Sequence, residues 1–484
     1  MYDKTYLPHF RNLIIFCLLF FPAAVFASTT GKEQLDLTGN TIGIVAVLTF
    51  IIAYIVVMAE EFTHLRKSKP VILAAGLIWG MIAFAYTQQG MPDSAELAVR
   101  HDLQEYAELF LFLLVAMTYI NAMEERLVFD ALKSWLIQKG FGYRKLFWLT
   151  GFLAFFISPI ADNLTTALLM CAVLMAVGSN SPKFVGLGCI NLVVAANAGG
   201  AFSPFGDITT LMVWQKKVVD FDSFFLLFVP SLVNFVVPAA IMHFAVPNMS
   251  PDMEDSGVQI KRGGKVIVWL FLLTIVTAVS FHNFLNMPPV IGMMTGLAFL
   301  QFYGYYLKKT HQVEVEQMKN NNGNGAFADD IVVFDVFHNV SRAEWDTLLF
   351  FYGVVLCVGG LGFIGYLAMV SNVMYGEWGA TNANIAVGFL SAIVDNIPVM
   401  FAVLNMQPDM SLGQWLLVTM TAGVGGSLLS IGSAAGVGLM GQAKGQYTFF
   451  THLKWTPAVL LGFAASIAVH MWINAGTFHL PPAH

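Results

Sequence analysis

The chain has 484 residues, of which 57% are hydrophobic and only 11% are charged, whereas soluble domains carry about 25% charged residues. A water-soluble protein of this length needs far more charge to cover its surface, so the composition indicates a protein of the lipid bilayer. A net charge of -6, without a basic patch outside short loops, disfavours nucleic-acid binding. The four cysteines lie in apolar stretches without metal-ligand or disulfide spacing, and no cofactor is expected.

The N-terminal segment has the features of a secretory signal peptide. Lys4 and Arg11 precede an apolar run that ends at Phe26, and small residues stand before Ser28 at the positions of a cleavage site. We therefore expect residues 1–27 to be removed. An uncleaved first helix is the alternative.

Eight further apolar runs are long enough to cross a membrane, since a spanning helix needs about 20 such residues. They are predicted at residues 41–59, 70–87, 107–123, 224–246, 265–282, 288–307, 347–365 and 455–475. Two more stretches, 146–215 and 382–441, are apolar but interrupted by Asp, Asn, Gly, Pro and Ser. We expect each of them to contribute one re-entrant helical hairpin and one broken helix that crosses, which makes about ten crossings.

Basic residues in the loops predict the orientation of these spans. With the mature N-terminus outside, 18 of the 24 lysines and arginines fall in inside loops and four fall outside. Both mature termini are therefore expected outside. Cytoplasmic loops are expected at residues 247–264 and 308–345, the second as a flexible linker between two halves. Residues 124–145 are amphipathic and predict a helix that lies in the membrane interface.

The two halves of the chain share three sequence blocks in the same order. FFISPIADNLTTALL around Asp162 aligns with GFLSAIVDNIPVMFA around Asp395, and the glycine-rich segment 199–207 aligns with 425–433. Upstream, AELFLFLL resembles WDTLLFFY. Five net crossings in each half would turn the second copy upside down, as in the inverted repeats of secondary transporters. A parallel repeat is the competing interpretation.

The predicted fold is therefore an all-α polytopic membrane protein with an inverted-topology repeat. Its first repeat covers residues 41–246 and its second repeat covers residues 265–475. The glycine-rich segments are expected to unwind their helices, which frees backbone carbonyls that can bind a cation at membrane depth. Close helix packing by small residues is the alternative explanation for the glycines.

Acidic residues inside the membrane are costly and mark candidate functional sites. Asp162, Asp207 and Asp395 lie deepest by sequence, whereas Glu108 and Asp346 are expected at the starts of their spans, where an acid also compensates the helix dipole. His101 is expected in an outside loop. Burial of a carboxylate favours its protonated form and a bound sodium ion favours its ionised form, so the two cations can compete for one site.

Neutral oxygen ligands for an alkali cation are expected beside these acids, although several of the hydroxyls would only cap helices or bond to backbone. The candidates are Asn163, Asn197, Asn396, Thr165, Thr166, Thr209, Thr210, Ser203, Ser427, Ser430 and Ser433.

The hairpin tips SPIADNLTT and SAIVDNIPV and the segments GGAFSPFGDITT and GGSLLSIGSAAG resemble the NhaD-type sodium/proton antiporters of the ion transporter superfamily. The resemblance covers essentially the whole chain after the signal. It implies a secondary transporter, not an enzyme, that exchanges sodium or lithium for protons across the bacterial cytoplasmic membrane and supports pH homeostasis. It places functional positions on Glu108, Ser158, Asp162, Asn163, Asn197, Asp207, Thr209, Thr210, Asp346, Ser391, Asn396, Ser430 and Ser433.

Two other classes of function stay open at this point. An anion or arsenite permease, or a sodium-coupled dicarboxylate transporter, would share the fold. The hairpin tips of the dicarboxylate symporters resemble Ser-Asn-Thr, and in this chain Asp162 and Asp395 stand at the position of that serine. An intramembrane aspartyl protease is a remote alternative that rests on the dipeptide Gly206-Asp207. The expected partners are small cations, protons and the bilayer, and the sequence leaves a homodimer open.

Overall fold

The computed structural model describes residues 34–63, 65–178, 181–249, 257–321, 334–443 and 445–482. Within these ranges the chain folds into helices joined by turns and short loops, without a strand. Ten helices of the described chain are long and apolar enough to cross a membrane, so this is an all-α multi-pass membrane protein. The predicted signal peptide lies outside the described residues.

The candidate membrane helices are α2 (Thr41–Met58), α4 (Ser68–Gln88), α5 (Pro92–Glu125), α7 (Tyr143–Ala161), α9 (Pro182–Gly200), α11 (Phe228–His243) with the preceding turn η1 (Asp222–Leu227), α12 (Gly264–Leu285), α13 (Pro289–Asn321), α15 (Trp345–Phe363) and α22 (Thr456–Ile473). The shorter helices are α3 (Glu60–Thr63), α6 (Val128–Gln138), α8 (Asn163–Val177), α10 (Ile208–Gln215), α14 (Val336–Ser341), α16 (Tyr366–Ser371), α17 (Ala380–Ser391), α18 (Asn396–Met406), α19 (Leu412–Gly425), α20 (Ala434–Gln442) and α21 (Phe449–Leu453).

The number of these helices agrees with the predicted ten, but their distribution along the chain differs. Both α7 and α9 come from the first interrupted stretch and reach spanning length. The corresponding α17 and α19 have 12 and 14 residues. The interrupted stretches are thus unequal in helix length.

Helix α5 is longer than predicted, which corrects the expected positions of two residues. It has 34 residues and begins at Pro92, so Glu108 lies in its middle and not at the start of a span. His101, expected in a loop, is helical. The polar first part of α5 is helical because proline is favourable at the first helical turn and Arg100 pairs with Glu96 one turn before it.

The predicted linker at 308–345 is partly helical. Helix α13 continues to Asn321 through a segment rich in Lys, Gln, Glu and Val, and α14 precedes α15 on the other side. Lysine, glutamine and glutamate favour helix, which explains the extension. Residues 322–333, in the middle of the predicted linker, lie outside the described residues. The predicted amphipathic segment contains α6.

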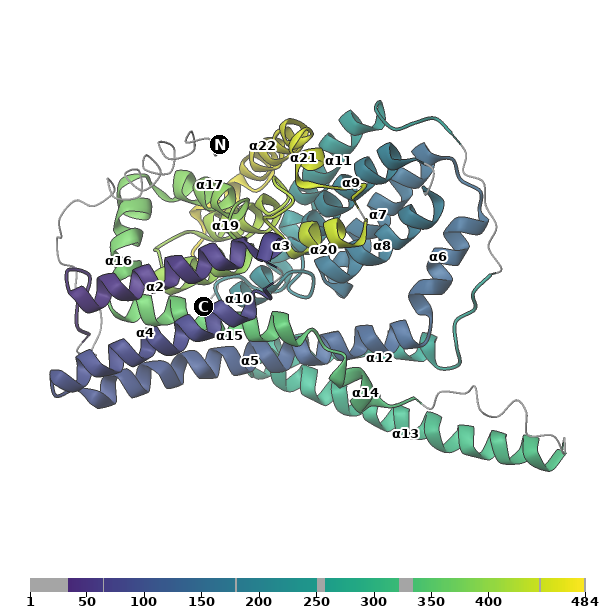
Figure 1. Cartoon of the computed structure of the whole chain (residues 1–484), viewed down its shortest axis with the longest axis horizontal. Coiled ribbons are helices and arrows are strands. Elements are labelled where there is room, and N and C mark those ends of the chain that lie inside the picture. The colour runs from purple at the N-terminus through teal and green to yellow at the C-terminus, as the bar shows by residue number, and fades with distance from the viewer. Residues whose placement is uncertain are drawn as a thin grey trace, which may run out of the picture.

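The two halves exchange their short helices near the centre of the molecule. Figure 1 shows α7, α8, α9 and α11 gathered in one region, and α17 and α19 in another. Helix α20 contacts α8 and α9 of the first half, and α10 contacts α18 and α19 of the second half. The two glycine-rich segments, which precede α10 and α20, lie beside the ends of α7 and α17 in their own halves, with Gly206 against Pro159 and Gly432 against Ala392.

Matching glycine contacts hold each broken helix against its neighbour. A Cβ at Gly199 would lie 2.3 Å from the carbonyl oxygen of Phe155, and a Cβ at Gly425 would lie 2.2 Å from that of Gly388. Phe155 and Gly388 each lie three residues before the serine of a tip motif. Glycine therefore permits backbone-to-backbone packing of α7 with α9 and of α17 with α19.

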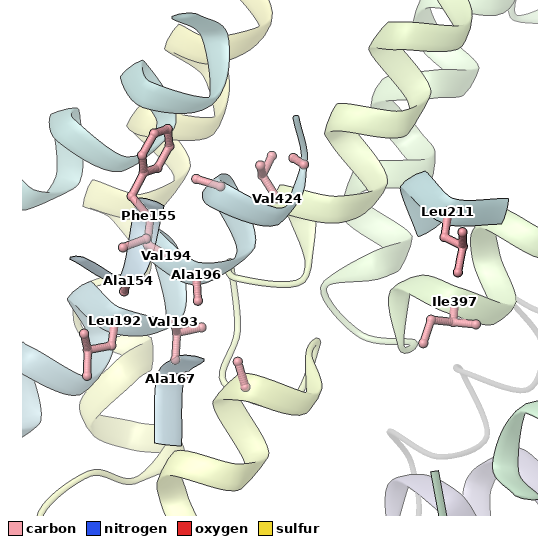
Figure 2. Close-up of a cluster of buried hydrophobic side chains, with 14 of the residues drawn as sticks. Ala154, Phe155, Ala167, Leu192, Val193, Val194, Ala196, Leu211, Ile397 and Val424 are labelled. Atoms are coloured by element: carbon pink, nitrogen blue, oxygen red, sulfur yellow. The ribbon is translucent and has the colours of Figure 1, made fainter. Parts of the chain in front are cut away.

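The core around these contacts is built from small and branched side chains of both halves. In Figure 2, Phe155 of α7 lies in one cluster with Val194 of α9, and Val424 of α19 belongs to the same core. In the apolar 18-residue stretch of α9, 94% of the residues are buried, so this helix forms the centre of the bundle and not its lipid face. The ends of the broken helices are thereby fixed in the interior.

Candidate functional site

A cavity of about 120 Å³ lies where the two predicted hairpin tips and the two broken helices meet. Eight of the predicted site residues line it: Asp162, Asn163, Thr165, Asn197, Asp207, Asp395, Asn396 and Ser433. Apolar side chains close part of its wall, among them Leu211 of α10 and Ile397 of α18, which Figure 2 shows close together. The fold thus gathers most of the predicted polar residues around one space.

Asp207 is the centre of the polar contacts in this cavity. Its Oδ1 accepts hydrogen bonds from the backbone amide of Thr209 at 2.9 Å and from the Thr209 hydroxyl at 3.0 Å, which caps α10. Its Oδ2 accepts from Nδ2 of Asn163 at 2.7 Å and from Nδ2 of Asn396 at 3.1 Å. One amide from each tip therefore holds the same buried carboxylate, which is 6% exposed.

Ser433 occupies the position of Asp207 in the second half but has different surroundings. It caps α20 and accepts a hydrogen bond from Nδ2 of Asn197 at 3.1 Å. The residue aligned with Asn197 is Gly423, where a Cβ would lie 3.8 Å from Asp207 Oδ2. A carboxylate therefore faces a glycine on one side of the site, while a hydroxyl faces an amide on the other. Because of this asymmetry, the second half contributes no side chain at the position of Gly423 beside Asp207.

The first tip has a capped aspartate in a strained backbone conformation. Asp162 accepts from the backbone amide of Thr165 at 2.9 Å and from its hydroxyl at 2.8 Å. Its φ of 56° lies in the left-handed region, which costs a residue other than glycine about 1–3 kcal/mol. Such strain persists only where the surroundings impose it, so the first tip is rigidly defined.

The second tip has an uncapped aspartate instead. Asp395 has a φ of -45° and makes no side-chain capping bond to α18. Pro398 stands where the first tip has Thr165, and proline has no backbone N–H to donate. Asp395 Oδ2 lies 3.7 Å from the ammonium of Lys67, and its Oδ1 has no hydrogen-bond partner among the described residues. Asp395 is therefore the more adaptable of the two carboxylates.

The serines of the two tips bond to backbone carbonyls of the broken helices. Ser158 donates to the carbonyl of Ala196, and Ser391 donates to the carbonyl of Ala422, each at 2.7 Å. Ser158 Oγ also lies 2.6 Å from Asn163 Oδ1. These hydroxyls join each tip to its broken helix and do not line the cavity.

Other predicted hydroxyls have similar structural contacts. Thr210 donates to the carbonyl of Ser203 at 2.7 Å, Ser203 donates to that of Pro159 at 2.9 Å, and Ser427 donates to that of Val424 at 2.6 Å. They satisfy carbonyls that the broken helices release, as required in a membrane interior. The remaining predicted hydroxyls are those of Thr166 and Ser430. Both are buried, neither lines the cavity, and neither has a hydrogen-bond partner among the described residues.

Glu108 and Asp346 lie apart from the aspartate cavity. Asp346 accepts a hydrogen bond from the hydroxyl of Ser68 at 2.5 Å. Glu108 lines a second cavity of about 240 Å³, together with Glu105 and Lys216, which pair with each other. Neither of the two upstream acids, which align with each other in the sequence, therefore lines the aspartate cavity.

The two cavities follow one another along shared helices. Helix α15 contributes Phe351 to the first and Val355 to the second, and α18 contributes Ile397 and Phe401 in the same order. On each helix the two residues are four positions apart, which is about one turn. A layer about one helical turn thick therefore separates the aspartate cavity from the Glu108 cavity.

Lys67 and Glu344 also line the cavity, although the sequence motifs do not predict them there. Lys67 was counted only as a loop residue that sets orientation, yet it pairs with Asp395. Pro398 was the available signal, because an aspartate that cannot cap its helix needs another partner. Glu344 is exposed and immediately precedes α15. An acidic residue at the start of a helix is common, because it compensates the helix dipole, so its position gave no sign of a cavity.

Comparisons with known proteins place the chain among membrane transport proteins. Residues 41–423 match the profile of the citrate transporter family CitMHS. The Na(+)/H(+) antiporter NhaD of Vibrio cholerae is 60% identical over 474 residues, which cover 97% of this chain and 99% of the relative. NhaD of Vibrio parahaemolyticus is 66% identical over 406 residues, covering 83% and 98%. Sodium/proton antiporter 1 of Arabidopsis thaliana is 31% identical over 451 residues, covering 90% and 73%.

Proposed function

The chain belongs to the family of the NhaD sodium/proton antiporters, and we propose that it exchanges sodium for protons by competition of the two cations at Asp207. The observation that carries this proposal is the Asp207 carboxylate, held by one asparagine from each tip inside a shared cavity. A transporter needs such a site between its two halves, because their relative movement then changes the access to it.

Sodium and a proton stabilise opposite states of this carboxylate. Burial favours the protonated acid, and a bound sodium ion favours the ionised form. The amides of Asn163 and Asn396 each carry one oxygen that a half-turn of the side chain directs at a cation beside Asp207. Gly423 leaves room there, and Asp162 and Asp395 add negative charge at the same cavity. Sodium entry and proton release are then one event at one site.

The Glu108 cavity supplies the route on the other side of the membrane in this proposal. It continues the aspartate cavity along α15 and α18, with one helical turn between them. A small movement of the tips against α5 and α15 would transfer Asp207 from one cavity to the other. Glu105 and Lys216, which pair within the second cavity, would line its polar entrance.

The repeat boundaries and orientation enter the same proposal. We place the two inverted repeats at residues 41–246 and 265–475, with residues 1–27 as a signal peptide and the mature termini outside the bacterial cytoplasmic membrane. The paired contacts of Ser158 and Ser391, and of Gly199 and Gly425, support the repeat. The bacterial relatives named NhaD support a location in the bacterial cytoplasmic membrane.

Transport of citrate is the second candidate, because the matching family profile has that name. The cavity argues against it on charge. Asp162, Asp207 and Asp395 line the cavity with Glu344, and Lys67 is the sole lysine or arginine among the described lining residues. An anion with several negative charges would be repelled there, whereas a sodium ion would be attracted.

Exchange in energised inverted vesicles tests the proposal. Addition of sodium chloride to wild-type vesicles should restore the fluorescence of a pH-sensitive dye, and Asp207→Asn should remove the response. Asp222→Asn is the matched control, because Asp222 is exposed and lines neither cavity. A full sodium response in Asp207→Asn would refute the role of this carboxylate, and a response to citrate in place of sodium would favour the second candidate.

A further inference from the structure

We propose that Lys67 is a tethered cation that occupies Asp395 when sodium is absent and is displaced by sodium, so that Lys67 sets the sodium affinity of the site. This inference rests on the proposed function and deepens it. It concerns a residue outside the two repeated tips, on the segment between α2 and α4. Its basis is the environment of the lysine and of its carboxylate.

Lys67 stands where a helix disfavours a positive charge. It immediately precedes α4, whose first turn contains no acidic residue, and its side chain makes no capping bond there. The N-terminal end of a helix carries a partial positive charge, so a lysine is unfavourable at this position. Its ammonium must therefore be stabilised by groups from other elements.

Two of those groups come from the second half of the chain. The Lys67 ammonium lies 3.7 Å from Asp395 Oδ2 and 4.6 Å from the centre of the Phe350 ring on α15. Both charged side chains of the pair are 17% exposed. Partial burial strengthens such a pair relative to one in water, and the aromatic face adds a cation–π interaction. Lys67 is thus held as a cation at the edge of the aspartate cavity.

Asp395 is built to exchange this partner. Pro398 removes the capping amide that would otherwise hold the carboxylate, and no described residue bonds to Oδ1. One carboxylate oxygen of Asp395 is therefore left without a donor beside the ion pair, and oxygen ligands suit a small hard cation.

The competition follows from the positions of these groups. When a sodium ion beside Asp207 also binds Asp395, which lines the same cavity, Lys67 loses its carboxylate partner. The ion and the ammonium then repel each other, so the ammonium moves away. Glu60 of α3 also interacts electrostatically with Lys67, so a second acidic group can receive the displaced ammonium. Removal of the lysine charge should accordingly make sodium bind more tightly.

The first experiment measures the sodium midpoint of exchange at alkaline pH, where protons compete least. Lys67→Met keeps the length of the side chain and the contact with Phe350 but removes the charge. We expect its sodium midpoint to fall about fivefold, which corresponds to the strongest ion pairs measured at exposed positions. Lys67→Arg should stay near the wild-type value. Lys69→Met is the matched control, because Lys69 is exposed and forms no ion pair within the described part of the chain.

The second experiment uses the wild-type protein and needs no variant to fold. An amine-acylating reagent should label Lys67 faster in sodium chloride than in choline chloride, while labelling of Lys69, resolved by mass spectrometry, should not change. Equal or slower labelling of Lys67 in sodium would overturn the inference, as would an unchanged or higher sodium midpoint in Lys67→Met. A wild type without any sodium-driven proton movement would instead refute the proposed function itself.

Discussion

The two tips of the repeat begin with the same dipeptide, Asp-Asn, and hold their aspartates in different ways. Asp162 is bound by Thr165 and sits at a φ of 56°, whereas Asp395 lacks a capping bond and pairs with Lys67 across the molecule. The difference follows from one position, since Thr165 aligns with Pro398. A duplicated motif has thus become one rigid tip and one whose carboxylate is free to change partners.

The asparagines of the same tips, by contrast, have kept a common contact. Asn163 and Asn396 both donate to Asp207 Oδ2. The comparison shows that the two halves are joined symmetrically through amides at the central carboxylate and asymmetrically through the aspartates beside it. Changes at the aspartates should therefore have unequal effects in the two halves, and changes at shared contacts should have equal ones.

The largest difference is expected between the two Asp→Asn variants. Asp395→Asn leaves the partly buried Lys67 without its carboxylate and should lower the free energy of unfolding by about 1–3 kcal/mol, less than the 3–5 kcal/mol for fully buried pairs. Asp162→Asn keeps an efficient capping side chain and should change it by less than about 0.5 kcal/mol. Denaturation in detergent measures both. Equal losses would contradict the assigned difference between the tips.

Equal losses are expected at the glycines that the halves share. Gly199→Ala and Gly425→Ala each place a Cβ within 2.3 Å of a carbonyl oxygen, so both should be destabilised by about 1–3 kcal/mol. Gly80→Ala is the control, because a Cβ there meets nothing within 4 Å. Thermal unfolding of the purified variants provides the measurement. A loss at only one of the two positions would argue against corresponding roles.

Exchange of the distinguishing residue should reduce the asymmetry between the tips. Pro398→Thr supplies the backbone donor and hydroxyl that Asp395 lacks, and a new capping bond should stabilise the protein by about 1 kcal/mol. The same bond should compete with Lys67 and sodium, so the sodium midpoint of exchange should rise. A stabilised variant with an unchanged midpoint would show that capping and cation binding at Asp395 are independent.

The smallest effect is expected beside Asp207. A Cβ at Gly423 would lie 3.8 Å from Asp207 Oδ2, an ordinary contact, so Gly423→Ala should change stability by less than about 0.5 kcal/mol. It would nevertheless occupy the space that we assign to the ion, and the sodium midpoint should rise. Gly441→Ala serves as control, since nothing lies within 4 Å of that position. An unchanged midpoint would place the ion elsewhere around Asp207.

Much of this organisation was predictable from the sequence. Low charge identified the membrane protein, apolar runs located most of the helices, and the repeated Asp-Asn and glycine-rich segments located the cavity residues. Errors arose where polarity was taken to end a helix. The first part of α5 is polar and helical, so Glu108 is in mid-helix, and α13 continues into the predicted linker.

The sequence by itself determined the local structural features, namely the capping residues, the broken helices and the duplicated tips, because each of them depends on neighbours in the chain. Only the tertiary structure decided which of these features contact one another. The exchange of α10 and α20 between halves makes Asp207 the common partner of Asn163 and Asn396, and the packing of α4 and α18 against α15 brings Lys67 to Asp395. Such contacts join residues from distant parts of the chain, and their pairing depends on how the helices pack rather than on any local pattern.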